Sequence, residues 1–161
     1  MTELESLAGY ALDRAKIEDT VAAFVLALDA RDIQGAVGRL AERVTWNYES
    51  VTGRPSAEVS PGELAARWHA TIVHTDASQH FLSLPHIRVD GDRARCVVHA
   101  RVEVRLSNPG GSPSTSTNGT YTFGLVRAGH GWRIDSVTMV LLWNDGNSRI
   151  MELAAEKGAR E

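Results

Sequence analysis

The sequence lacks several features that would define its chemistry at once. Its 161 residues contain one cysteine, Cys96, which excludes an internal disulfide framework and a cysteine-rich zinc site. Neither sign of charge is in large excess: 17 basic side chains stand against 20 acidic ones, and the net charge of −3 does not attract a phosphate backbone. No stretch approaches the roughly 18 consecutive apolar residues of a membrane-spanning helix. We therefore expect neither nucleic acid nor a membrane as a partner.

Other motifs are also missing. There is no internal repeat, no long linker and no Ser-x-x-Lys, Gly-x-Ser-x-Gly or phosphate-binding loop, so covalent and nucleotide chemistry lack support. The first residues, Met1 to Ser6, are polar and carry two glutamates, unlike the basic start of a secretory signal. We expect a cytoplasmic protein with a single domain over residues 1–161.

The first half of the chain has helical periodicity. Apolar residues recur at spacings of three and four at Ile17, Val21, Phe24, Val25 and Leu28, which predicts a helix over residues 13–30. Leucines 4 and 7 indicate a short helix before it, and apolar residues 33, 37 and 40 indicate a short helix after it. The capping box from Ser60 to Glu63, with proline at the first helical position, predicts a further helix to about residue 74.

The second half of the chain changes to a period of two. Apolar and charged residues alternate over 93–105, which predicts a strand with one apolar and one charged face. We expect further strands over 79–89, 117–127 and 132–143, a loop over 107–119 and a last helix over 147–157. Helices followed by strands predict an α+β fold, in which helices pack on a strongly curved antiparallel sheet that encloses a pocket for a small, mostly apolar molecule.

Six segments have the order and spacing of a known family. They are residues 12–17, beginning Leu12-Asp13-Arg14, then Ala27 to Asp32, Val44 to Tyr48, Ser78 to Phe81, Val89 to Ala94 and Gly131 to Ile134. In these segments the sequence resembles the nuclear-transport-factor-2-like superfamily, in its polyketide-cyclase-like (SnoaL-like) and scytalone-dehydratase-like branch. The resemblance implies a cone-shaped fold. It does not fix the chemistry, because the superfamily includes dehydratases, isomerases, cyclases, epoxide hydrolases and non-catalytic binders.

The resemblance also implies three catalytic residues. In scytalone-dehydratase-like enzymes the histidine of the Gln-His-Phe segment faces the pocket and handles the proton, and His80 occupies that position. A tyrosine on the first strand, here Tyr48, holds the substrate carbonyl, and an aspartate at the end of the long helix, here Asp29, orients the site. The alternation of His80 with leucines 82 and 84 independently indicates an inward-facing position.

Two polar residues of that family are missing from this sequence. Leu28 stands where those enzymes have a second tyrosine, and Val104 or Arg105 stands where they have a second pocket histidine. These differences favour an alternative in which the chain is a non-catalytic domain that binds a small molecule or a protein partner. A third possibility, epoxide hydrolysis, needs two acids and an arginine around one water, and the sequence assigns no such trio.

The three implied residues suffice for one kind of chemistry. A histidine can accept and return a proton near neutral pH, a carboxylate fixes its tautomer, and a phenol stabilises an enolate oxygen. We therefore expect a cofactor-free lyase or isomerase/cyclase that removes a proton α to a carbonyl of a small polyketide-like, aromatic or steroid-like compound. Dehydration, a double-bond shift or ring closure would follow. No metal is expected, because His69 and His74 are five residues apart and do not share a helix face.

Other residues are candidates for substrate contacts or for contacts between subunits. The candidate substrate-binding residues are Trp46, Trp68, Thr120, Thr122, Trp143 and Asn144, although the tryptophans and threonines are also ordinary core and strand residues. The charged strand face contains Arg95, Arg101, Glu103 and Arg105. We expect this outer face either to form a homodimer or homotrimer or to be simply solvated.

Overall fold

A computed structural model describes residues 2–160, so Met1 and Glu161, the ends of the predicted domain, lie outside the described residues. The helices are α1 (Glu3–Asp29), α2 (Ile33–Val37), α3 (Glu49–Thr52), α4 (Pro61–Ala70), the 3₁₀-helix η1 (Ile72–His74) and α5 (Ile150–Gly158). The strands are β1 (Leu40–Asn47), β2 (Ala57–Val59), β3 (Ala77–Leu82), β4 (His86–Asp90), β5 (Arg93–Arg105), β6 (Ser114–Ala128) and β7 (Gly131–Gly146). Among the described helices, none is both long and apolar enough to cross a bilayer.

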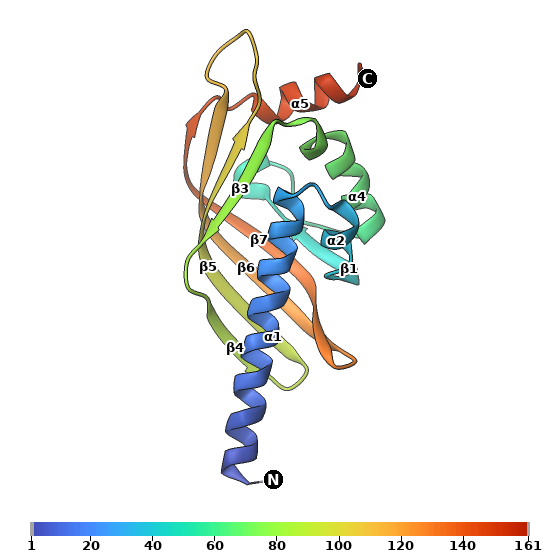
Figure 1. Cartoon of the computed structure of the whole chain (residues 1–161), viewed down its shortest axis with the longest axis vertical. Coiled ribbons are helices and arrows are strands. Elements are labelled where there is room, and N and C mark those ends of the chain that lie inside the picture. Colours follow the sequence, from blue (N-terminus) through green and yellow to red (C-terminus); the bar gives the residue numbers. More distant parts are fainter. Residues whose placement is uncertain (1, 161) are drawn as a thin grey trace.

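The strands form one sheet with helices packed on its inner face, as the α+β prediction required (Figure 1). The order is β2-β1-β7-β6-β5-β3, and β4 pairs with the other half of β5. Apolar residues of α1, including Ile17 and Phe24, pack against inward residues of the sheet such as Phe123 and Ile134. The helix stripe and the strand alternation that the sequence displays therefore meet in one core.

The sheet is mixed: its strand pairs are antiparallel, as predicted, except for one parallel pair that the sequence did not indicate. Strand β1 pairs with β7 in parallel, from Leu40 opposite Ile134 to Asn47 opposite Thr138. The two strands lie far apart in the sequence, and such a parallel pair requires a long connection, which β2 to β6 provide. Bulges between β6 and β7 bend the sheet further. At one of them a Cβ on Gly119 would collide with the Val140 carbonyl oxygen, so this close approach requires glycine.

Several predicted elements have different boundaries; strand β6, for example, begins at Ser114, inside the loop expected over 107–119. The two helices expected before residue 30 are one helix, α1, which begins with a capping box between Thr2 and Glu5. Leu40 begins β1 instead of ending a helix. The strand expected over 79–89 is divided into β3 and β4, because Pro85 has no N–H for the ladder, and Leu84 is consequently exposed.

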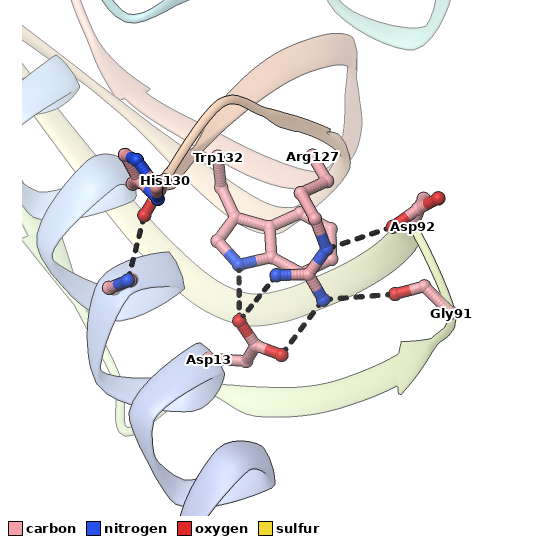
Figure 2. Close-up of polar contacts among 7 residues, drawn as sticks. Asp13, Gly91, Asp92, Arg127, His130 and Trp132 are labelled. Atoms are coloured by element: carbon pink, nitrogen blue, oxygen red, sulfur yellow. Dashed lines mark hydrogen bonds and ion pairs between the residues drawn. The ribbon is translucent and has the colours of Figure 1, made fainter.

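The N-terminal half of α1 is joined to two hairpins by a polar cluster around Asp13, more than two turns from the start of the helix (Figure 2). The Asp13 carboxylate accepts hydrogen bonds from Arg127 Nη1 and Nη2 at 2.8 and 2.9 Å and from Trp132 Nε1 at 3.1 Å. The same guanidinium donates to Asp92 Oδ1 at 2.9 Å and lies over the Trp132 ring at 4.5 Å. These hydrogen bonds raise the pKa of Arg127, and the bond to Asp13 has the largest effect. One carboxylate thus connects α1 to the β6–β7 hairpin.

We expect Asp13→Ala to lower the free energy of unfolding by about 2 kcal/mol, because hydrogen bonds to a charged group contribute more than neutral ones. The Asp13 side chain is 17% exposed, and its loss leaves Trp132 Nε1 without this acceptor. Asp92→Ala is the matched control, since Asp92 binds the same guanidinium but is 85% exposed. Urea unfolding followed by circular dichroism measures both variants, and equal losses would contradict this account.

Candidate functional site

A mostly apolar cavity of about 330 Å³ lies between the helices and the inner face of the sheet. Its apolar wall includes Leu28 at the end of α1, Val104 of β5 and Met139 of β7. Trp46 of β1 and Trp68 of α4 close one side, with ring centroids 6.0 Å apart in an edge-on arrangement. A space of this size and lining suits a small apolar molecule.

At the edge of the cavity, the Asp29 carboxylate joins the last turn of α1 to strand β3. Its Oδ2 accepts a hydrogen bond from the backbone N–H of His80 at 2.7 Å. Its Oδ1 lies 2.7 Å from Nδ1 of the same histidine and accepts from Ser78 Oγ at 3.2 Å. The bond between the two side chains is largely shielded from water, because they are 15% and 9% exposed.

The hydrogen bonds also determine the charge of Asp29. Burial favours the neutral acid, but the hydrogen bonds from the side chain and backbone of His80, the charge attraction to it and the bond from Ser78 outweigh burial. The pKa of Asp29 is therefore lower than usual. An ionised carboxylate can only accept hydrogen bonds, so Nδ1 of His80 carries the hydrogen that faces it.

The other ring nitrogen of His80, Nε2, has no hydrogen-bond partner in the described part of the chain. His80 is a lining residue of the cavity. With the hydrogen on Nδ1, the neutral ring has its lone pair on Nε2. This nitrogen is thus available to accept a proton from a molecule in the cavity.

The turn after Asp29 is also tied to the chain that leads into β3. Arg31 has a left-handed backbone conformation, with φ of 58°, which is strained for a residue other than glycine. Its Nη2 donates to the carbonyl oxygen of Thr75 at 2.5 Å. This contact and the Asp29 contacts hold the end of α1 against the same short stretch of chain.

Two phenols face each other inside the cavity. The hydroxyl of Tyr48, which directly follows β1, lies 2.7 Å from the hydroxyl of Tyr121 of β6. Burial raises the pKa of Tyr121 to about 12 and that of Tyr48 further above its usual value, so both are neutral near pH 7. The Tyr48 ring stacks on Trp46 at 4.8 Å. The Tyr121 ring lies 6.4 Å from the His80 ring.

The structure brings together five of the nine residues that the sequence singled out. Around the cavity lie His80, Asp29, Tyr48, Trp46 and Trp68, with Asp29 behind His80. Tyr121 was not among the candidates. A signal for it was present, since it alternates with the apolar residues 123 and 125 on β6 and so had to face inward.

The other four candidates are not among the residues that line this cavity. Thr120 and Thr122 neighbour the inward-facing Tyr121, so alternation turns both to the outer face, where Thr122 Oγ1 lies 3.5 Å from Arg95. Trp143 lies in a groove on the outer face beside Phe81, because a bulge opposite Gly119 shifts the register of β7. Asn144, the next residue of β7, is opposite Thr117 and is exposed.

The positions that differ from scytalone-dehydratase-like enzymes form part of the apolar wall. Leu28 and Val104 both line the cavity, whereas Arg105 is exposed on the outer face. No second histidine lines the cavity among the described residues. Within residues 2–160, no three His, Cys, Asp or Glu side chains are grouped as metal ligands. His80 is therefore the one imidazole that can act on a bound molecule here.

Comparisons with known proteins agree with this architecture. The sequence matches the SnoaL-like domain family over residues 9–138, and the chain belongs to that family. No curated protein sequence matches it. Among solved structures, the Kfla4162 protein from Kribbella flavida superposes with a TM-score of 0.84 at 25% identity, covering 89% of this chain and 99% of that one.

Two more distant structures show the same fold. A Novosphingobium aromaticivorans protein named as a scytalone dehydratase has a TM-score of 0.75 at 14% identity, covering 86% of this chain and 89% of its own. The hexachlorocyclohexane dehydrochlorinase LinA-type3 from Novosphingobium barchaimii has a TM-score of 0.71 at 15% identity, covering 91% and 94%. The fold is thus the cone of nuclear-transport-factor-2-like proteins, as the resemblance implied.

We expect Asp29→Asn to destabilise the protein by about 2 kcal/mol near pH 6, since the variant loses hydrogen bonds to a charged group. The pKa of Asp29 in the folded state lies below its ordinary value of 3.8. Its ionised form therefore stabilises the fold above about pH 4, and this contribution is lost as the pH falls through the folded-state pKa. The difference in unfolding free energy between wild type and variant should shrink from pH 5 downward.

Guanidinium unfolding at a series of pH values measures this difference. Ser78→Ala is the matched control, because it removes only the longest of the three bonds to Asp29 and should give a smaller loss with the same trend. A difference between wild type and Asp29→Asn that did not change with pH would show that the carboxylate does not stabilise the fold through its charge.

Proposed function

We propose that the protein is an enzyme without a cofactor, a lyase or isomerase/cyclase that removes a proton α to a carbonyl of a small apolar compound. The observation that carries the proposal is the unpaired Nε2 of His80, in a ring held by Asp29 beside a buried and a partly buried phenol in an apolar cavity. The dehydratase and dehydrochlorinase names of proteins with this fold support an elimination, because both words describe loss of a small leaving group.

The proposed reaction begins with transfer of the α-proton to Nε2 of His80. The electron pair of the C–H bond forms an enolate, and the negative charge of Asp29 stabilises the imidazolium. A phenol of the Tyr48–Tyr121 pair donates a hydrogen bond to the enolate oxygen. The enolate then expels a β-hydroxyl, which leaves as water with the proton from His80; return of the proton to another carbon instead gives a double-bond shift.

The presence of a single imidazole places a condition on this chemistry. The base that removes the α-proton must also supply the proton to the leaving group, since no second histidine lines the cavity among the described residues. One ring can reach both positions only from one side of the substrate. The elimination is therefore proposed to be syn, with both groups leaving from the same face.

A non-catalytic binding domain is the second candidate function. Leu28 and Val104 favour it, because apolar side chains occupy two positions that are polar in scytalone-dehydratase-like enzymes. Such a domain would bind the same kind of apolar molecule in the same cavity. It would differ only in leaving the α-proton in place.

We expect the wild-type protein to accelerate deuterium uptake at the α-carbon of 2-tetralone in D₂O, followed by proton NMR. His80→Ala should reduce this acceleration by about 10²–10⁴-fold, the usual contribution of a positioned acid–base group. His80→Gln is a second variant that retains a polar side chain beside Asp29 and cannot take up the proton. His99→Ala, on the outer face, is the matched control.

Two results would count against catalysis. If 2-tetralone bound to the wild type without faster exchange, the binding-domain alternative would hold. If both His80 variants exchanged as fast as the wild type while folded by circular dichroism, His80 would have no part in the reaction.

We also propose that the outer face of the sheet contacts a second copy of the chain, as a homodimer or homotrimer. Half-exposed apolar side chains gather there, namely Phe81, Val140, Leu142 and Trp143. Arg101 and Glu103 form an ion pair on the same face and could pair with their counterparts across a symmetry axis. Exposed apolar patches bordered by charge are typical of interfaces between subunits.

We expect the protein to elute as an oligomer whose mass, measured by light scattering, falls to that of one chain in Leu142→Arg. A buried arginine without a partner is unfavourable in an interface, whereas it is harmless on a solvated face. Leu7→Arg, at a leucine of α1 that is about as exposed as Leu142, is the control. A wild-type protein that stays monomeric at high concentration would show that the face is solvated.

A further inference from the structure

We propose that Tyr121 is the phenol that donates to the substrate oxygen, and that Tyr48 is a positioning residue behind it. The inference rests on the proposed function, because it assigns the oxyanion donor of that reaction. It changes the role that sequence resemblance implies for Tyr48, and it gives a catalytic role to a residue that the sequence did not single out.

The first argument concerns the distance between the reacting atoms. The α-carbon and the oxygen of one carbonyl compound are only about 2.4 Å apart, as their bond lengths require. The proton acceptor and the oxyanion donor must therefore be neighbours. The ring of Tyr121 lies 6.4 Å from that of His80, with 30° between the planes. The ring of Tyr48 is instead stacked on Trp46, with 2° between their planes.

The second argument concerns the number of protons. Two neutral phenols have two hydroxyl hydrogens, and the bond of 2.7 Å between Tyr48 and Tyr121 uses one of them. Neither hydroxyl has another hydrogen-bond partner within the described chain. The hydrogen that remains free belongs to whichever phenol accepts the mutual bond. A substrate oxygen near His80 requires that this phenol be Tyr121.

The direction from Tyr48 to Tyr121 to substrate is also the favourable one once charge develops. As the enolate forms, the oxygen of Tyr121 gains electron density and becomes a better acceptor for the hydroxyl of Tyr48.

The test uses 4-nitrophenolate, an aromatic oxyanion whose visible absorbance reports binding and ionisation. We expect Tyr121→Phe to weaken its binding by about 10- to 100-fold, since a hydrogen bond to a charged oxygen is lost. Tyr48→Phe should weaken it by less than about 5-fold, because only the supporting bond is lost. Tyr10→Phe, an exposed tyrosine of α1, is the matched control and should bind as the wild type does.

A second measurement does not require the Tyr121 variant to fold. Protein made with 3-fluorotyrosine contains three labelled residues, and Tyr10→Phe and Tyr48→Phe assign their fluorine resonances. We expect 4-nitrophenolate to shift the Tyr121 resonance most and to leave that of Tyr10 in place. A larger shift or a larger loss of affinity at Tyr48, or a wild-type protein that does not bind the probe, would overturn the inference.

The two proposals can fail separately. His80→Ala should reduce exchange into 2-tetralone by the factor given above yet still bind 4-nitrophenolate, because the phenol pair remains. A wild-type protein that binds the probe through Tyr121 but does not catalyse exchange keeps this inference and rejects the enzymatic function. A protein that exchanges normally in Tyr121→Phe keeps the function and rejects the role of Tyr121.

Discussion

The site depends on one carboxylate that serves two purposes. Asp29 accepts the backbone N–H of His80, which fixes strand β3 against the end of α1, and it also accepts the Nδ1 hydrogen of the same residue. A single side chain thus positions the backbone, the ring and the tautomer. Because burial opposes its charge and hydrogen bonds restore it, the ionised carboxylate and the edge strand stabilise each other. Removing either partner would leave the other poorly satisfied.

Much of the fold could be predicted from the sequence, because local signals and the tertiary structure agree. The apolar stripe of α1, the capping box at Ser60 and the alternation along β5 each correspond to an element of the structure. The parallel pairing of β1 with β7 could not be predicted in this way. It joins segments that lie far apart in the sequence, and neither strand has a pattern that distinguishes parallel from antiparallel neighbours.

The sequence pointed to those residues of the candidate site that short local segments identify. It missed those whose direction depends on how two strands are paired. His80 and Asp29 could be identified because the short segments that contain them resemble the corresponding segments of scytalone-dehydratase-like enzymes. Thr120 and Tyr121 are adjacent on β6, and adjacent side chains of a strand point to opposite faces of the sheet. An error of one residue therefore exchanges the inner and outer positions. Likewise, the bulge near Gly119 turns Trp143 outward, and no local sequence signal specified that bulge. Strand register, more than residue type, therefore determines which side chains line the cavity.

The cavity is completed by residues from both ends of the chain, and this has a consequence for its biosynthesis. Leu28 lies at the end of the first helix, whereas Met139 and Met151 come from β7 and the beginning of α5. During translation the histidine and its carboxylate leave the ribosome long before these methionines do. The apolar chamber can therefore close only after β7 and the beginning of α5 have left the ribosome.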